Sequence, residues 1–229
     1  MANGKSIWKS KSMEECSEKP KQKKLWQRSF FYWLILPLAI LLLAGLALTG
    51  YLYWFFNYRK LPPPPDVEPI RAQLQTGDIV LRSGVGLWSE LFRNNNEHDK
   101  RFSHVGVALV EPDGECFVIH AEANDTTGSG TVYVMPLADY VRDSDGIGIA
   151  RLHTLDPAKF AAAVRKYEGT AFDWKFDADD HSSIYCTELV ELALQDIAPD
   201  ASLKRGGYGI IMPESCLDQR YFTEIAIQK

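Results

Sequence analysis

Cysteine is scarce in this sequence, which limits how far disulfides can hold the fold together. The 229 residues contain four cysteines, and three of them, Cys116, Cys186 and Cys216, follow the apolar segment described below. An oxidising compartment would therefore leave at least one thiol unpaired, and Cys116 with Cys216 is one possible pair. No cysteine follows Leu43-Ala44-Gly45, so the lipid anchor of a lipoprotein is not indicated. The sequence also contains no internal repeat.

Two motifs that could bind a metal ion are incomplete. His120-Ala121-Glu122 matches the first part of the zinc deaminase signature, but no Pro-Cys-x-x-Cys follows it. Asp179-Asp180-His181 offers ligand side chains, yet nothing nearby completes a spaced set, and a solvated loop is the simpler interpretation. The sequence therefore predicts no metal and no organic cofactor.

Charge is absent from residues 30–56, a run longer than the roughly 20 apolar residues with which a helix crosses a bilayer. Aromatic residues at both ends of the run suit the level of the lipid headgroups. A buried core helix and a cleaved signal peptide are the alternatives. The run is long for a signal peptide, and no clear small-residue cleavage site follows it. We therefore expect an uncleaved transmembrane signal anchor.

The charges on either side of this run predict its orientation. Residues 1–29 have a net charge of +5, whereas only Arg59 and Lys60 lie close by on the other side. The positive-inside rule places the N-terminus in the cytoplasm, so residues 57–229 face the periplasm or another extracytoplasmic space from a single-pass protein of the inner membrane. Since the whole chain has a net charge of −5, this outer part carries −10 and is a poor candidate for binding nucleic acid.

These observations divide the chain into four parts. Residues 1–29 form a basic cytoplasmic tail that we expect to be disordered, and residues 30–56 form the anchor. Residues 57–70 include four consecutive prolines, which favour an extended spacer. Residues 71–229 form one globular domain, and nothing in the sequence predicts its oligomeric state.

Strands and helices are interleaved in the globular part. A capped helix is expected after Asp156, because a proline follows directly and apolar residues then recur at helical spacing. A second helix is expected at residues 183–197. Together with apolar strand segments, this order predicts an α+β domain in which an antiparallel central sheet packs on helices. The expected strands are residues 77–82, 103–110, 116–123, 131–135, 147–152 and 221–227, and residues 86–92 are expected to form a short helix.

One loop predicts the pairing of the two central strands. Glu111-Pro112-Asp113-Gly114-Glu115 fits a type I turn closed by a left-handed glycine. Pairing its two glutamates places position 110 opposite 116, 108 opposite 118, and His104 opposite Glu122. Opposed Cβ atoms lie about 4.5–5.5 Å apart, so the carboxylate could fix the tautomer of the imidazole and stabilise its protonated form. A purely structural ion pair is the alternative.

Cys186 is expected at the N-terminal end of the second helix, on the face that Leu189 and Val190 bury. The helix dipole at that end lowers the pKa of a thiol, and the first-turn amides could stabilise an oxyanion. A buried cysteine that serves only as a small apolar residue is the alternative. Glu188 and Glu191 fall on the opposite face, which we expect to be exposed to solvent.

Four short segments in a fixed order resemble a known family. They are Gly77-Asp78-Ile79-Val80, Phe102-Ser103-His104-Val105-Gly106, Ile119-His120-Ala121-Glu122-Ala123 and Tyr185-Cys186-Thr187-Glu188-Leu189-Val190. Over about residues 71–227 the chain resembles the YiiX/YebB-like hydrolases, which are circularly permuted, papain-like and related to the NlpC peptidases.

The resemblance implies roles for three residues. Cys186 would be the nucleophile, His104 the base and Glu122 the third polar residue, and the permutation accounts for the histidine preceding the cysteine. Two positions depart from the family pattern: Thr187 stands where serine is common, and Phe172 stands where tyrosine is usual.

A membrane-anchored cysteine hydrolase is the function that these observations predict. It would be an amidase or peptidase that cleaves an amide bond through an acyl-enzyme. Cell-wall peptides and lipid-linked amides are both candidate substrates. A lipid acyltransferase of the lecithin retinol acyltransferase type and a catalytically inactive binding module remain the alternatives.

Overall fold

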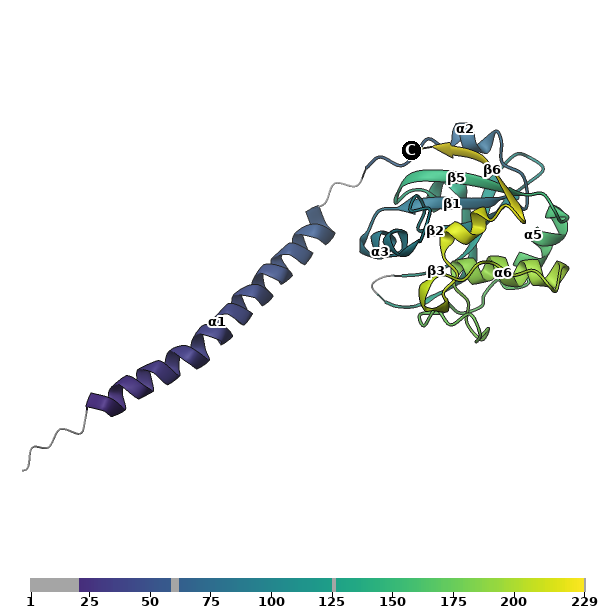
Figure 1. The fold of residues 1–229 in the computed structure, drawn as a ribbon. Coiled ribbons are helices and arrows are strands. Elements are labelled where there is room, and N and C mark those ends of the chain that lie inside the picture. Colours follow the sequence, from purple (N-terminus) through teal and green to yellow (C-terminus); the bar gives the residue numbers. More distant parts are fainter. Residues whose placement is uncertain (1–20, 59–61, 125–126, 229) are drawn as a thin grey trace, which may run out of the picture. The chain divides into compact units, whose positions relative to one another are not determined.

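The computed structural model describes residues 21–58, 62–124 and 127–228 (Figure 1). The chain separates into two compact units, Met1–Lys60 and Leu61–Lys229, and each is described by itself. Most of the expected basic tail, including Cys16, lies outside the described residues, so the prediction of disorder there stays a prediction.

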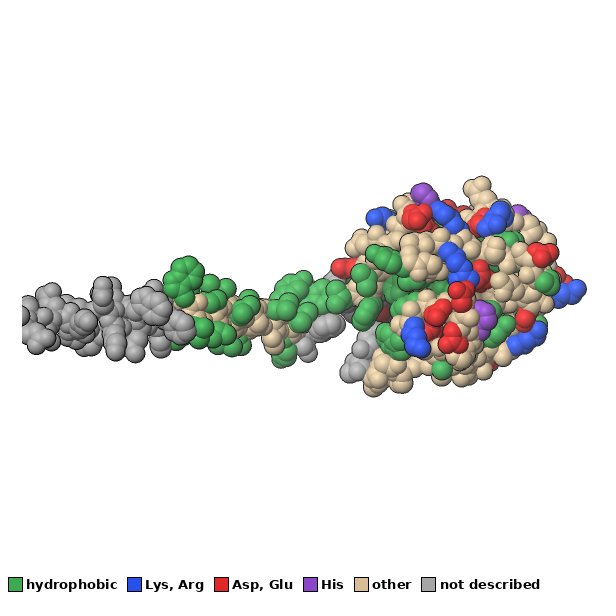
Figure 2. Space-filling model, turned by 60° about the horizontal axis from the view of Figure 1, so that its bottom comes forward, with side chains coloured by type: hydrophobic (Ala, Val, Ile, Leu, Met, Phe, Trp, Pro, Cys, Tyr) green, Lys and Arg blue, Asp and Glu red, His purple; other side chains and the backbone are tan. Residues whose placement is uncertain are grey.

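The first unit contains one long helix, α1 (Lys21–Tyr58), with Pro37 inside it. Its segment Tyr32–Phe55 has a mean hydropathy of 2.3 and is long and apolar enough to cross a membrane. Figure 2 shows apolar side chains covering the described part of this helix, whereas acidic and basic side chains are scattered over the globular unit. A signal sequence near an N-terminus has the same properties, so α1 is a candidate span by length and composition.

The second unit is built on a six-stranded antiparallel sheet with the order β4-β3-β2-β1-β5-β6. This confirms the predicted α+β class. The strands are β1 (Ile79–Gly84), β2 (His104–Val110), β3 (Cys116–Ala123), β4 (Gly130–Pro136), β5 (Ser144–Leu152) and β6 (Phe222–Gln228).

Helices cover the sheet, and the sheet separates two apolar clusters. The larger cluster joins one sheet face to the buried sides of α5 (Pro157–Arg165) and α6 (Cys186–Ile197). The Asp156 carboxylate accepts backbone N–H groups at the start of α5, as its predicted cap requires. The smaller cluster contains the residues that alternate with these along the same strands, so it lies on the opposite face of the sheet. The remaining helical segments are α2 (Glu68–Arg71), α3 (Leu87–Asn95), α4 (Leu137–Tyr140), η1 (Gly207–Gly209) and η2 (Pro213–Leu217).

The hairpin between β2 and β3 has the predicted register. Val110 pairs with Cys116 and Ala108 with Val118. In the loop Gly114 has φ +84°, the left-handed conformation that the turn requires, and its N–H donates to Glu111. The pairing of β2 with β3 ends at Val107 and Ile119. His104, the first residue of β2, pairs with Arg82 of β1 on the other edge of β2.

Candidate active site

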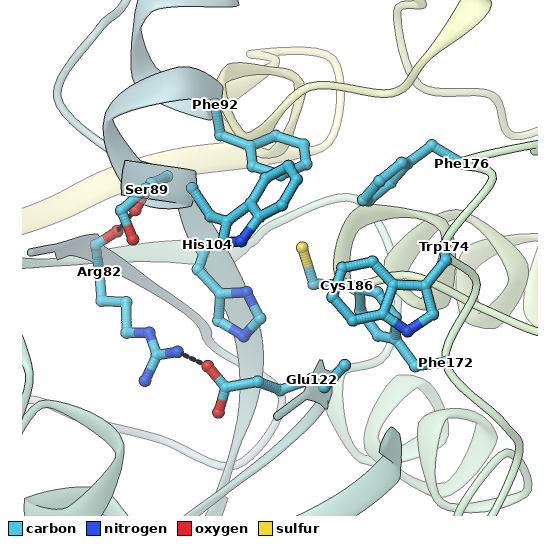
Figure 3. Close-up of a pocket in the computed structure, with 12 residues that line it drawn as sticks. Arg82, Ser89, Phe92, His104, Glu122, Phe172, Trp174, Phe176 and Cys186 are labelled. Atoms are coloured by element: carbon cyan, nitrogen blue, oxygen red, sulfur yellow. Dashed lines mark hydrogen bonds and ion pairs between the residues drawn. The ribbon is translucent and has the colours of Figure 1, made fainter. Parts of the chain in front are cut away.

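A cleft in the second unit brings together the three predicted site residues, which come from three different elements (Figure 3). His104 begins β2, Glu122 lies near the end of β3, and Cys186 is the first residue of α6. In this view the imidazole of His104 lies between the thiol of Cys186 and the carboxylate of Glu122. The lining residues are Arg82, Trp88, Ser89, Phe92, Ser103, His104, Glu122, Ala123, Phe172, Trp174, Phe176 and Cys186.

The thiol of Cys186 occupies the predicted helix terminus, but its acidity differs from the prediction. Burial raises the pKa of Cys186 to about 11, although the backbone N–H groups of Val105 and Thr187 favour the thiolate and act in the opposite direction. The expectation that the helix terminus lowers the pKa overall was therefore wrong, because burial outweighs the amides. The thiol in the resting site is protonated at neutral pH and needs a base to become a nucleophile.

We assign the proton of His104 to one of its two ring nitrogens from a chain of contacts on one sheet face. Nε2 of His120 lies 3.0 Å from Sδ of Met135. Since a thioether has no proton to donate, Nε2 of His120 is the donor, and Nδ1 of this neutral ring is an acceptor. Nε2 of His104, which lies 2.9 Å from that Nδ1, must then donate the hydrogen bond. The remaining nitrogen, Nδ1 of His104, is left unprotonated and can accept a proton.

Both imidazoles are neutral at neutral pH, which this assignment requires. Burial and then the positive charge of Arg82 lower the pKa of His120 to about 3. Burial, Arg82 and His120 together lower the pKa of His104 well below its usual value. Among the described residues, the side chains of His104 and Cys186 form no hydrogen bond with each other.

Glu122 contacts the histidine pair from the side, and its hydrogen bonds go elsewhere. Its carboxylate is bonded to the guanidinium of Arg82 and accepts a 3.2 Å hydrogen bond from the hydroxyl of Tyr133. Oε2 of Glu122 lies 3.9 Å from Nδ1 of His120. The carboxylate thus lies near His104, as the hairpin register predicts, but His120 is the direct hydrogen-bond partner of His104.

Sequence reasoning missed His120 and Arg82 as members of this group. A signal for His120 was available, because positions 120 and 122 share one face of a strand and the register places His120 opposite Gly106. A Cβ atom at Gly106 would lie only 3.0 Å from Cβ of His120 and 2.4 Å from Cγ1 of Val118. The missing side chain therefore leaves room for His120 beside His104.

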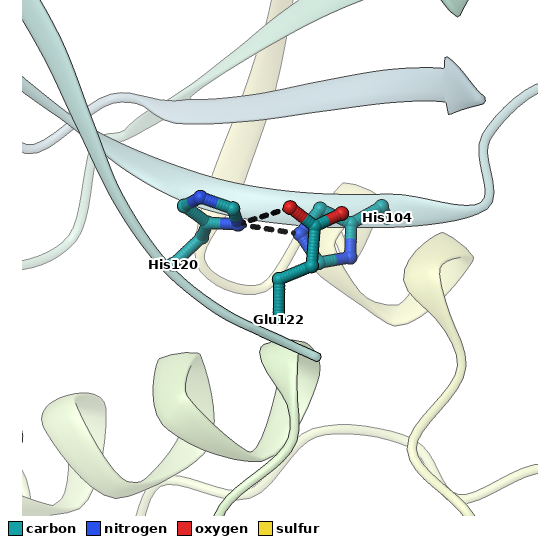
Figure 4. A group of neighbouring side chains, drawn as sticks. All are labelled: His104, His120 and Glu122. Atoms are coloured by element: carbon teal, nitrogen blue, oxygen red, sulfur yellow. Dashed lines mark hydrogen bonds and ion pairs between the residues drawn. The ribbon is translucent and has the colours of Figure 1, made fainter. Parts of the chain in front are cut away.

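These three side chains also have the composition of a metal site (Figure 4). One ligand atom from each of His104, His120 and Glu122 lies within 4.8 Å of the other two. From the sequence, His120-Ala121-Glu122 was not predicted to bind metal because no Pro-Cys-x-x-Cys follows it, and His104 was not predicted as a third ligand.

Aromatic rings form one wall of the cleft. Trp88 lies 6.2 Å from Trp174 between ring centroids, and Phe92 lies 5.1 Å from Phe176. Phe172, which stands where the family usually has tyrosine, contacts Trp174 in the same wall. A neighbouring apolar groove shares Trp88, Phe92 and Phe176 with the cleft and continues along Leu91, Asn95, Gly207, Tyr208, Ile210 and Met212.

On its other side the cleft adjoins a polar pocket, which shares Arg82, Trp88 and Glu122 with it. Asp139, Arg142 and Asp143 line the same pocket. An apolar groove and a polar pocket thus flank the thiol and the histidine pair.

Two expectations for residues outside the cleft were wrong. Glu188 and Glu191 are buried, although they were expected to face solvent. Oε1 of Glu188 lies 2.9 Å from Nδ1 of His181. Oε1 of Glu191 accepts a 2.8 Å hydrogen bond from the backbone N–H of Leu203. His181 lies in an exposed loop, as expected, but its ring is also the partner of the buried carboxylate of Glu188.

The other two cysteines of the globular unit do not form the disulfide that was considered. Cys116 and Cys216 are both free and buried. Burial raises the pKa of each thiol, so neither has the character of a reactive thiolate.

Comparison with known proteins identifies the family. The profile of the permuted papain-like amidase enzymes, the YaeF/YiiX or C92 family, matches residues 73–205. Among solved structures, the metalloprotein yiiX from Escherichia coli O157:H7 aligns with a TM-score of 0.55 and 19% identity, over 68% of this chain and 98% of that one. No curated protein matches the sequence. The profile covers more than half of the chain and includes all three predicted site residues, so the chain belongs to the permuted papain-like amidases of the YaeF/YiiX family, which are cysteine hydrolases.

Proposed function

We propose that this protein is a membrane-anchored cysteine amidase in which Cys186 is the nucleophile and His104 the general base. The observation that carries the proposal is the assignment of the His104 tautomer. Its Nε2 is occupied by His120, so Nδ1 is the nitrogen free to take the proton of a thiol in the same cleft. Family membership supports the reaction class.

The proposed reaction has two steps, acylation and deacylation. As the sulfur of Cys186 attacks the carbonyl carbon of the amide, its proton passes to Nδ1 of His104. His104 then gives that proton to the leaving amine, and the carbon–nitrogen bond breaks to leave a thioester. Water, deprotonated by His104, attacks the thioester, and the thiol leaves with a proton as the carboxylic acid is released.

In this proposal His120 is a positioning residue, and Glu122 assists by its charge. The hydrogen bond from His104 to His120 holds the base in the required tautomer. The carboxylate of Glu122 lies near both rings and favours the imidazolium that forms in the reaction, while Arg82 holds that carboxylate in place.

The surroundings of the thiol favour a substrate with one apolar and one polar end. The aromatic wall and the adjoining apolar groove suit the acyl chain of a lipid-linked amide, and the polar pocket suits its head group. An anchor formed by α1, with a periplasmic or extracytoplasmic catalytic unit, would keep the enzyme at the membrane surface where such lipids are found. A cell-wall peptide is the second candidate, which the polar pocket favours.

The test uses the full-length chain in detergent micelles. Wild type, Cys186→Ala and the matched control Cys116→Ala are incubated with N-acyl lipid amides and with muropeptides, and products are identified by mass spectrometry. We expect hydrolysis of lipid amides by wild type and Cys116→Ala only. Identical product patterns for wild type and Cys186→Ala on every substrate would refute the proposal. Acyl transfer to an acceptor other than water would instead identify an acyltransferase.

A further inference from the structure

We propose that His104, His120 and Glu122 form a binding site for one divalent transition-metal ion of the zinc class, and that the occupied site cannot activate Cys186. Metal binding at these side chains stands independently of the hydrolase reaction. The inhibition rests on the proposed function, because it concerns the role of His104 as base.

The distances between the ligand atoms suit a single ion. Nε2 of His104 and Nδ1 of His120 lie 2.9 Å apart, and Oε2 of Glu122 lies 3.9 Å from that Nδ1. In a tetrahedral zinc site with bonds of about 2.0–2.1 Å, ligand atoms are about 3.4 Å apart. The two nitrogens therefore need to separate by only about half an ångström, and the carboxylate oxygen to approach by a similar amount.

The chemical state of the ligands also suits a metal ion. A neutral imidazole offers one nitrogen lone pair, and Nε2 of His104 and Nδ1 of His120 face one another in this cluster. The second nitrogen of His120 donates to Met135, which directs the lone pair of Nδ1 towards His104 and the site. Arg82 is bonded to Oε1 of Glu122, whereas Oε2 accepts one hydrogen bond from Tyr133 and keeps a second lone pair for the metal. The positive charge of Arg82 opposes a second cation, so binding is weaker than in a site without it.

Metal binding and thiol activation require different tautomers of His104. In the metal-free site the proton lies on Nε2, and Nδ1 accepts the proton of Cys186. When Nε2 gives its lone pair to the metal, its proton moves through solvent to Nδ1, and the ring remains neutral. Nδ1 then carries a hydrogen and has no lone pair for the thiol. The occupied site is therefore an inhibited site, and a chelator restores the enzyme.

The binding test uses Zn²⁺ as the probe and calorimetry as the readout. Full-length protein in micelles is stripped with a chelator, exchanged into chelator-free buffer and titrated with ZnCl₂. We expect one equivalent to bind, with affinity at least about tenfold lower in His120→Ala and in Glu122→Gln, since even the loss of a supporting contact costs tenfold or more. The matched control is His153→Ala, which removes an exposed histidine outside the cluster. Melting curves establish that each variant is folded, and the near-isosteric Glu122→Gln provides the test if His120→Ala is not.

Four results would overturn the proposal in whole or in part. Unchanged affinity in both His120→Ala and Glu122→Gln, or no saturable binding by wild type, would remove the site. Loss of binding in Cys186→Ala would place the metal on the thiol instead. If Zn²⁺ binds but does not slow alkylation of Cys186 by iodoacetamide, binding stands and inhibition falls. Binding is measured without substrate, so a failure of the proposed hydrolysis leaves this result unaffected.

Discussion

The imidazole of His104 donates from Nε2 to Nδ1 of His120 across 2.9 Å, and Met135 on the far side of His120 fixes the direction of that bond. The pair lies diagonally across the β2–β3 hairpin. Its register, with Val107 opposite Ile119, would place His104 opposite Glu122 and His120 opposite Gly106 if it were continued by three residues. Diagonal neighbours on one sheet face are within reach of long side chains. The base of the proposed reaction is thus held by the neighbouring strand.

His120→Ala should lower kcat/KM for an amide substrate by about a hundredfold, because the proton of His104 is then free to move to Nδ1. His120→Asn, whose side-chain oxygen can accept the same hydrogen bond, should recover part of the loss. Steady-state kinetics over a range of pH measure both variants. Equal losses in the two would mean that the ring serves packing and not the tautomer.

Alkylation of Cys186 by iodoacetamide should become faster as the pH rises towards about 11, because burial raises the pKa of this thiol. The thiolate fraction falls tenfold for each pH unit below the pKa, so at neutral pH the rate should be well below that of a free thiol with a pKa near 8.5. Mass spectrometry of the modified peptide, with metal-free protein, measures the rate. A plateau reached near neutral pH would contradict the prediction and indicate an ion pair with His104.

Local patterns were sufficient to predict the parts of the site that depend on neighbouring residues in the chain. The turn at Gly114 predicted the register of the hairpin, and the apolar spacing after Cys186 predicted a thiol at a helix start. The His104–His120 bond was missed because register specifies directly opposed pairs, whereas rotamers decide which diagonal neighbours meet.

The chemical environment of the site depended on segments distant in sequence. Glu191 was expected in solvent because the stripe on its helix is polar, but Leu203 and Arg205 return from a later loop to bind its carboxylate. The acidity of Cys186 was misjudged for a similar reason. The helix terminus can be read locally, whereas the burial that outweighs it comes from the packing of the whole unit.

Gly106→Ala should destabilise the globular unit by about 1–3 kcal/mol, the usual cost of overpacking a core. The added Cβ atom would lie 2.4 Å from Cγ1 of Val118 and 3.0 Å from Cβ of His120. A displaced His120 should also lower activity more than the loss of stability accounts for. Thermal melting and kinetics below the melting transition separate the two effects. Gly86→Ala, where the backbone is extended and no atom lies within 4 Å of the added Cβ, is the control for an added methyl group without a clash.

Arg82→Met should destabilise the protein and raise the pKa of His104. The substitution leaves the carboxylate of Glu122 without its guanidinium partner, at a cost of about 1–3 kcal/mol. Arg82 is the second cause, after burial, of the depressed pKa of His104, and that repulsion disappears with its charge. Thermal melting measures the stability, and NMR titration of the imidazole protons measures the pKa. A His104 that titrates at an unchanged pH would mean that burial and His120, without Arg82, set its acidity.

Trp88→Ala should discriminate between substrates by the length of their acyl chain. Its indole lines both the cleft and the apolar groove, so its loss removes apolar contact from a chain long enough to enter the groove and little from a short one. Each buried CH₂ group contributes about 0.8 kcal/mol, so KM for a long-chain amide should rise by about tenfold or more, while KM for an acetyl amide should change little. Kinetics with a series of N-acyl amides of increasing length measure this difference. An equal rise in KM across the series would mean that the acyl chain binds outside the groove. The effect of Trp88→Ala depends on acyl length only if the acyl chain lies in the groove.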